Sequence, residues 1–446
     1  MGAGLDQLKL EPVSAGNERP FSAQREVLLD LFATAVDAVS AGTAMPREMP
    51  AASHGRTVLL AVGKAAAAMA RIAVERIPVP VSGLIVTRYG HLDEGPPLAN
   101  FDIIESGHPV PDAQSVRAAQ RALDMAQGLT AHDQLLVLLS GGGSALMAAP
   151  APGVSLEDKQ AVTRALLQSG ATIGEINCVR KHISQVKGGR LALAAGPAKV
   201  TTLIISDVPG DDPSFVSSGP TVADTTTLEM AREIVGRYGI ALPTSVTAAL
   251  ADPANETPSG DSLGLAGAET KVIARARDAL AAASRRAEAL GYLVTGLGDQ
   301  LQAEARHLGA GHAALARRLS ADGARRVIIS GGETTVTVTN KKGRGGRNLE
   351  YLLGMAIALQ GAPGIFALAC DTDGIDGTDA AAGAVVTPDS LERAARAGLD
   401  PAQHLRMNNA YTFFEALGDL VVTGPTRTNV NDFRAIVIDG ASTAPA

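Results

Sequence analysis

The stretch that decides the fold reads, from residue 327, Val-Ile-Ile-Ser-Gly-Gly-Glu-Thr-Thr-Val-Thr-Val-Thr, and it continues to Gly-Arg-Gly-Gly-Arg-Asn at 343–348. Its three β-branched residues predict a buried strand, which Ser330-Gly331-Gly332 ends abruptly. The alternation of 335–339 predicts a second strand. The apolar spacing of 348–360 then predicts a helix.

Four cations and three glycines lie between Lys341 and Arg347, directly before this predicted helix. Glycine lets backbone amides approach an anion closely, and arginine can bind two phosphate oxygens at once. The N-terminus of the helix adds a positive dipole. The stretch therefore predicts half of a phosphate-binding site, to which Ser330, Gly331 and Gly332 contribute. A hairpin with a solvated basic turn is the alternative.

The composition of the chain is that of a soluble α/β enzyme. Its 446 residues are enough for two or three domains, and 46% hydrophobic with 19% charged residues is ordinary for a globular protein. A net charge of −7 argues against nucleic-acid or membrane-surface partners. The two cysteines form no metal-binding pattern. Without an apolar signal core or a membrane-length run, we expect a cytoplasmic protein, and the sequence leaves homo-oligomerisation open.

Strands alternate with helices over the first half of the chain, joined by short glycine turns. The predicted strands are 57–62, 83–87, 101–105, 134–139 and 199–206. This order predicts a doubly wound parallel sheet. A cluster of Asp, Pro, Ser and Gly at 251–268 indicates a boundary between a domain at 20–255 and a second α/β domain at 256–446. Strand 271–274 is expected to open the second domain. Because Ser-Gly-Gly follows a strand once in each half, we expect two lobes that present similar loops to one cleft.

A glycine-rich loop, Ser140-Gly141-Gly142-Gly143-Ser144, follows a buried predicted strand. In a parallel sheet this is the edge where ligands bind, and its amides could hold a phosphate. The loop lacks the G-x-G-x-x-G spacing of dinucleotide-binding proteins. Lys64 lies at another strand-to-helix turn, where its ammonium could reach a phosphoryl oxygen. An exposed lysine at a helix start is an equal alternative.

The segment 177–190 concentrates four permanent cations and one histidine. Arg180, Lys181 and Lys187 are candidates for binding an anionic substrate, although a solvated basic helix face is the usual explanation of such a pattern. His182 could act as a base, but a lone histidine is more often structural. The same caution applies to His108, a further substrate-binding candidate in a proline-rich turn.

Two acidic loops follow predicted buried strands. One contains Asp207, the first candidate for a metal ligand, and the other contains Asp371 and Asp373, either of which is the second choice. Carboxylates at a sheet edge suit Mg²⁺, which takes one or two of them together with phosphate oxygens and water. Aspartates that cap turns are the alternative. Glycine loops, cations and carboxylates together favour phosphoryl transfer over hydrolysis or hydride transfer.

Nine segments in this order resemble the class II glycerate kinase family, and the region of about 326–438 resembles its MOFRL domain. They read VGKA, GHPVPD, SGGGSALM, NCVRKHISQVKGGRLA, ISDVPGDDPSFVSSGPT, SGGETTV, GRGGRNLEY, DTDGIDGTDAAAGA and TNVND. Arg427 departs from the pattern, standing where glycine is common.

The resemblance implies an N-terminal Rossmann-like domain and a C-terminal α/β domain, with the active site in the cleft between them. It implies transfer of phosphate from ATP to D-glycerate with a divalent cation, here taken as Mg²⁺, typically giving 2-phosphoglycerate. Lys64 and Arg347 would stabilise the transferred phosphoryl group. The alternative is an NAD(P)H-dependent hydroxypyruvate reductase, against which the missing dinucleotide pattern counts.

Overall fold

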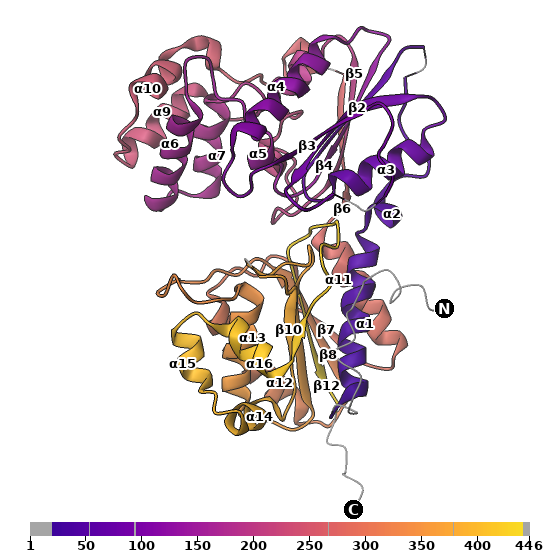
Figure 1. Cartoon of the computed structure of the whole chain (residues 1–446), viewed down its shortest axis with the longest axis vertical. Coiled ribbons are helices and arrows are strands. Elements are labelled where there is room, and N and C mark those ends of the chain that lie inside the picture. Colours follow the sequence, from indigo (N-terminus) through magenta and orange to yellow (C-terminus); the bar gives the residue numbers. More distant parts are fainter. Residues whose placement is uncertain (1–19, 53, 93–94, 266, 378, 440–446) are drawn as a thin grey trace, which may run out of the picture. The chain divides into compact units, whose positions relative to one another are not determined.

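The computed structural model describes residues 20–52, 54–92, 95–265, 267–377 and 379–439, and the chain divides into two compact units (Figure 1). We call residues 44–274 the N-terminal unit. The described residues up to Thr43, together with those from Arg275 onward, form the C-terminal unit.

The N-terminal unit contains a six-stranded sheet in which all strands are parallel, in the order β3-β2-β1-β4-β5-β6. Its strands are β1 (Thr57–Val62), β2 (Val81–Arg88), β3 (Phe101–Ser106), β4 (Gln134–Leu139), β5 (Lys199–Ile205) and β6 (Ala268–Ala274). The predicted doubly wound parallel sheet is therefore confirmed. The strand order reverses between β1 and β4, and in such sheets ligands bind at the carboxyl ends of the strands beside this switch point.

Helices cover both faces of this sheet, with α3 and α4 on opposite sides (Figure 1). The α-helices of the unit are α3 (Ala66–Arg76), α4 (Ala113–Gln127), α5 (Gly143–Leu146), α6 (Leu156–Gln168), α7 (Ile173–His182), α8 (Arg190–Ala195), α9 (Leu228–Arg237) and α10 (Thr244–Ala251). The short α2 (Ala41–Ala44) lies at the division of the units. The 3₁₀ turns are η1 (Val216–Ser218), η2 (Pro253–Asn255) and η3 (Leu263–Leu265). α6, α7, α9 and α10 pack around a separate apolar core.

The C-terminal unit contains a mixed six-stranded sheet in the order β11-β10-β9-β12-β8-β7. Its strands are β7 (Leu293–Gly296), β8 (Arg326–Gly332), β9 (Ile365–Asp371), β10 (Gly383–Val386), β11 (Leu420–Val421) and β12 (Asp432–Ile438). α1 (Ser22–Ala38) and α11 (Ala276–Ala289) cover one face, and α12 (Ala305–Ser320) and α13 (Arg347–Leu359) the other (Figure 1). Three short helices follow, α14 (Ser390–Arg396), α15 (Pro401–Arg406) and α16 (Ala410–Leu417).

The strand predicted at 335–339 is wrong, although the strand and helix predicted on either side of it are confirmed as β8 and α13. β8 already pairs with β7 and β12, so the sheet offers this segment no free edge beside β8. Two amides of this segment donate to side chains and not to a neighbouring strand. The Thr337 amide donates to the Glu304 carboxylate and the Thr339 amide to the Asn408 side-chain oxygen, both at 2.9 Å. The alternation reflects these local contacts and not a sheet.

The boundaries of the two units differ from the single domain boundary that the sequence predicted between residues 255 and 256. β6 pairs with β5, so the strand expected to open the second domain completes the first sheet. α1, expected in the first domain, packs on β9 and β12. Its Phe32 ring lies 5.9 Å from that of Phe433, and Arg25 forms a 2.6 Å ion pair with Asp419. Strand pairing and helix docking between distant segments decide this membership, and a local change of composition does not report them.

No helix in the described ranges is both long and apolar enough to span a membrane.

Candidate active site

Two loops meet at the switch point of the N-terminal sheet. After β1 the chain turns through Lys64 into α3, and after β4 it turns through 140–144 into α5. The Lys64 amide donates to the carbonyl of Gly141, and the Ala65 amide donates to the hydroxyl of Ser140, both at 3.0 Å. The structure thus brings Lys64 and the glycine-rich loop together, although they lie about 75 residues apart in sequence.

Two of the predicted substrate-binding cations converge on Ser144, at the end of this loop. The Ser144 hydroxyl accepts from Arg180 at 2.6 Å and from the Lys187 ammonium at 2.9 Å. Lys187 also donates to the Ser144 carbonyl at 2.7 Å, and the Ser218 hydroxyl lies 2.7 Å from that of Ser144. This cluster of Ser144, Arg180, Lys187 and Ser218 is called the N-terminal cationic cluster below.

The cationic cluster has no acidic counterpart within the part of the chain that the structure describes. Lys187 is buried, and its pKa is held well below the ordinary lysine value by burial and by the charges of Arg180 and Lys159. Lys159 is buried as well and donates only to the carbonyls of Arg180 and Ile183, at 3.2 and 2.6 Å. Buried cations without carboxylates are costly on their own. An anionic ligand would reduce that cost.

Lys181 and His182 are held by the protein itself, unlike their neighbours. The Lys181 ammonium forms a buried 3.1 Å ion pair with Asp224. The His182 ring contacts the carbonyl of Cys178 at 2.8 Å and the carboxylate of Glu256 at 3.1 Å. Their polar atoms are thus engaged in packing the helices, which supports the structural alternative for both residues.

The structure places His108 beside the glycine-rich loop: a Cβ on Gly142 would lie 3.1 Å from its ring. Asp207 follows β5 at the carboxyl edge of the same sheet and is partly buried. The sequence reasoning missed Ser217 and Ser218, two buried residues with φ of 52° and 62°. Strained non-glycine residues of this kind are frequent at functional sites. The only sequence signal was their place in a quoted family segment.

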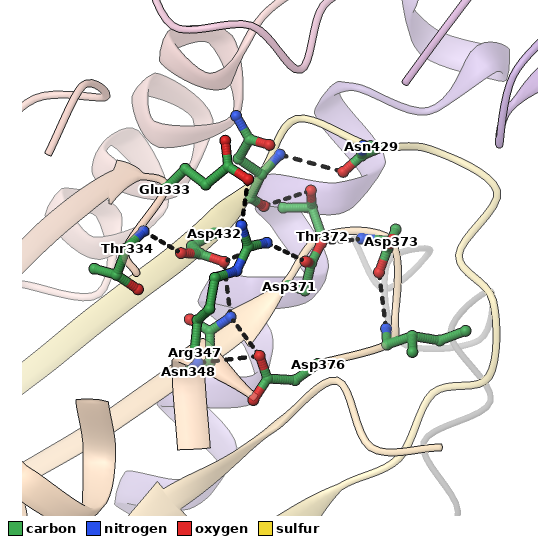
Figure 2. A network of polar contacts seen from close by, with 12 residues as sticks. Glu333, Thr334, Arg347, Asn348, Asp371, Thr372, Asp373, Asp376, Asn429 and Asp432 are labelled. Atoms are coloured by element: carbon green, nitrogen blue, oxygen red, sulfur yellow. Dashed lines mark hydrogen bonds and ion pairs between the residues drawn. The ribbon is translucent and has the colours of Figure 1, made fainter. Parts of the chain in front are cut away.

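In the C-terminal unit, Arg347 lies among three carboxylates (Figure 2). Its guanidinium contacts Glu333, forms a 3.1 Å ion pair with Asp371 and lies 3.6 Å from Asp432. Burial acts to lower the pKa of Arg347, but Asp432, Asp371 and Glu333 outweigh it and raise this pKa above the ordinary arginine value. Arg347 is therefore a fixed positive charge that still has part of its side chain exposed.

Strand register explains why these groups meet. Asp432, the first residue of β12, lies opposite both Gly332 of β8 and Asp371 of β9. Asn348 donates its side-chain amide to Asp432 at 2.8 Å, and the buried Arg434 also contacts Asp432. The carboxyl ends of β8 and β9 and the start of β12 therefore share one edge of the sheet. Asp432 was not among the predicted site residues because its strand register is not visible in the sequence.

Ser330, Gly331 and Gly332 belong to β8 and are buried. The Gly331 amide donates to the carbonyl of Gly298 at 2.9 Å. Gly332 has φ of 109°, and a Cβ there would lie 2.3 Å from the carbonyl oxygen of Leu301. Close packing thus accounts for these glycines, so we do not assign phosphate contacts to them. In the N-terminal loop, by contrast, the amides of 142–144 donate to no backbone carbonyl of the described residues.

Across the described residues, no group of three or more histidine, cysteine or carboxylate side chains is arranged to hold a metal ion. Asp371 ends β9 and Asp373 follows in the next loop, and the Asp373 amide donates to Asp371 at 3.1 Å (Figure 2). Mg²⁺ needs only one or two carboxylates when phosphate oxygens and water complete its shell. This pair therefore fits a metal that arrives with a nucleotide.

Comparison with known proteins decides the family. Residues 27–251 match the family described as a domain of unknown function (DUF4147), and residues 326–432 match the MOFRL family. The chain is 39% identical over 413 residues to a D-glycerate 2-kinase of Thermotoga maritima, covering 92% of this chain and 97% of that protein. The chain belongs to the class II glycerate kinase family.

Two further comparisons describe its place among the class II glycerate kinases. A crystal structure of glycerate kinase from Thermotoga maritima has a TM-score of 0.84 at 38% identity, covering 93% of this chain and 99% of that one. A protein of Agrobacterium vitis named "Putative hydroxypyruvate reductase" is 50% identical over 420 residues, or 93% of this chain and 94% of that protein.

The MOFRL match covers the whole environment of Arg347. It begins with β8 and ends at Asp432, so Glu333, Asp371 and Asp432 all lie within it. The DUF4147 match covers Lys64 and the N-terminal cationic cluster. The residues around Lys64 and the residues around Arg347, each at the edge of a sheet, therefore fall in different family matches.

Proposed function

We propose that the chain is an ATP-dependent kinase that phosphorylates D-glycerate to 2-phosphoglycerate. The observation that carries this proposal is the arrangement of Arg347 as a fixed cation beside Asp371 and Asp373, at the sheet edge of a unit shared with glycerate kinases. Phosphoryl transfer requires cations around the transferred group and a divalent metal, with little covalent chemistry from the protein.

The residues take the following roles in this proposal. Lys64 and Arg347 each supply a cation that stabilises charge on phosphoryl oxygens, and the amides of 142–144, which donate to no backbone carbonyl of the described residues, bind phosphate oxygens. Asp371 and Asp373 would hold Mg²⁺, with Asp207 as a further candidate, and the metal would neutralise phosphate charge when bound.

The substrate carboxylate is assigned to the N-terminal cationic cluster. Arg180 is only partly buried, so its guanidinium can face a ligand while Lys187 holds Ser144 in place. A 2-hydroxy acid carries the negative charge that this cluster lacks. His108, beside Gly142, is the further candidate for contact with the acid.

A hydroxypyruvate reductase is the second candidate, favoured by the name of the Agrobacterium vitis relative. The first βα turn argues against it. Dinucleotide-binding sheets of this strand order have a glycine-rich fingerprint after their first strand. Here β1 is followed by Gly63-Lys64-Ala65-Ala66, with a single glycine.

One experiment separates the candidates. Purified protein is incubated with ATP, Mg²⁺ and D-glycerate, and enolase is added without a phosphoglycerate mutase. Phosphoenolpyruvate should form, because enolase acts on the 2-phosphorylated product. A requirement for mutase would instead show phosphorylation at the 3-position. Oxidation of NADH with hydroxypyruvate, without ADP formation from D-glycerate, would support the reductase.

A further inference from the structure

Asp376 lies in the loop after β9, and its carboxylate caps the N-terminus of α13 (Figure 2). α13 begins at Arg347 after Gly346, and glycine has no side chain to accept the amide hydrogen bonds of the first turn. The two carboxylate oxygens of Asp376 accept them instead, from the amide of Asn348 at 3.0 Å and from the amide of Leu349 at 2.9 Å. The loop after β9 therefore fixes the start of α13.

The backbones on either side of this cap are also in direct contact. A Cβ on Gly346 would lie 2.4 Å from the carboxyl carbon of Asp376, and a Cβ on Gly377 would lie 2.5 Å from the carbonyl oxygen of Gly345. The two segments are therefore closely packed against each other. Three glycines in 343–346 leave the chain before α13 with little stiffness of its own.

Asp376 is completely buried, and its carboxylate is held by the amides of α13. Burial raises its pKa to about 6, against the amide hydrogen bonds of Asn348 and Leu349, which lower it. At neutral pH the carboxylate is therefore mostly ionised, and the positive end of the helix dipole lies beside it.

Arg347 is the first residue of α13, so the cap fixes the backbone from which its guanidinium extends. From that position the guanidinium lies 3.1 Å from Asp371 and 3.6 Å from Asp432. We propose that Asp376 is the positioning residue of Arg347: by clamping the first turn of α13, it holds the guanidinium where the transferred phosphoryl group needs a cation. The inference rests on the role that the proposed function gives to Arg347.

A double-mutant cycle tests the inference, with kcat and both KM values measured for D-glycerate and ATP. Asp376→Asn keeps the size of the side chain but cannot accept both amide hydrogen bonds. It should lower kcat by about tenfold to a hundredfold, the scale for a small misplacement of a catalytic group, and leave both KM values near those of the wild type. In the Arg347→Ala background it should lower kcat no further, because the two residues act as one unit.

Gly346→Ala disturbs the same contact from the residue before the helix, because its Cβ would meet the Asp376 carboxylate. This variant replaces Asp376→Asn in the test if Asp376→Asn does not fold. It should lower kcat in the same range and likewise have no added effect on Arg347→Ala. Asp400→Ala is the matched control. Asp400 caps α15 in the same unit through a 3.1 Å hydrogen bond from the Gln403 amide, so its loss should reduce stability but not kcat.

The outcomes distinguish this inference from the proposed function. If Arg347→Ala loses activity about a hundredfold but Asp376→Asn and Gly346→Ala lower the remaining kcat additively, or leave kcat unchanged in the wild-type background, the positioning role is refuted and the kinase stands. If Arg347→Ala itself keeps wild-type kcat, the role assigned to Arg347 fails, and the inference fails with it.

Discussion

Arg347→Ala should cost the enzyme both activity and stability, and the two effects can be separated. Loss of one preorganised charge contact to a transition state typically lowers kcat by at least about a hundredfold, or about 2.7 kcal/mol. The substitution also removes the 3.1 Å ion pair that Arg347 forms with the buried Asp371. Removing one partner of a buried ion pair costs about 3 kcal/mol of unfolding free energy.

The assay couples 2-phosphoglycerate formation to enolase, and urea unfolding gives the fraction of folded protein at the assay temperature. Arg393→Ala is the matched control: Arg393 pairs with Asp419 at 2.7 Å and with Asp389 at 3.0 Å, and its side chain is 24% exposed against 28% for Arg347. Because Arg25 also pairs with Asp419, the control should lose less stability than Arg347→Ala and should keep kcat per folded molecule. Near-normal kcat in Arg347→Ala, or an equal loss of kcat in Arg393→Ala, would refute the reasoning.

Three other results are expected. Lys64→Ala should lower kcat at least about a hundredfold by the same loss of a charge contact, and unchanged turnover in the coupled assay would remove Lys64 from the site. Gly332→Ala should destabilise the protein by about 3 kcal/mol in urea, because φ is 109° and the new Cβ meets the Leu301 carbonyl, so a wild-type unfolding midpoint would contradict the contact. Burial, reinforced by Asp432, raises the pKa of Asp376 to about 6 from an ordinary value of about 3.9, so the folded state binds this proton more tightly than the unfolded state. From pH 4 to 6 the unfolding free energy of the wild type should therefore fall by up to about 3 kcal/mol relative to Asp376→Asn, and parallel pH profiles would show that Asp376 does not titrate as described.

Arg427 shows how a departure from the family pattern is accommodated. The sequence marks it as a residue in a place where glycine is common, and the structure gives it φ of 60°, in the left-handed region. Glycine enters this region without steric cost, whereas arginine is strained there. The loop before β12 nevertheless leads into Asp432, which keeps its hydrogen bond from Asn348.

Much of the fold could be predicted from local patterns. Continuous apolar runs identified β1, β4, β5 and β9, because strands buried on both faces need no alternation. Alternation alone was misleading at 335–339, where the side chains of Glu304 and Asn408 accept the amide hydrogen bonds of Thr337 and Thr339. The periodicity of apolar residues indicates which side chains are buried, but it does not indicate which group accepts the hydrogen bond of each backbone amide.

The sequence by itself determined the residue types of the site: cations at the glycine turns, carboxylates after buried strands and a glycine-rich loop after β4. Only the tertiary structure decided which of them act together. Lys181 and Lys187 are alike in sequence, yet one is paired with Asp224 and the other donates to Ser144. Asp376 is one of several loop aspartates until the packing of α13 against β9 brings it to the start of that helix. The reason is that contacts between segments far apart in the chain depend on strand register and helix docking, which are set by packing of the whole unit.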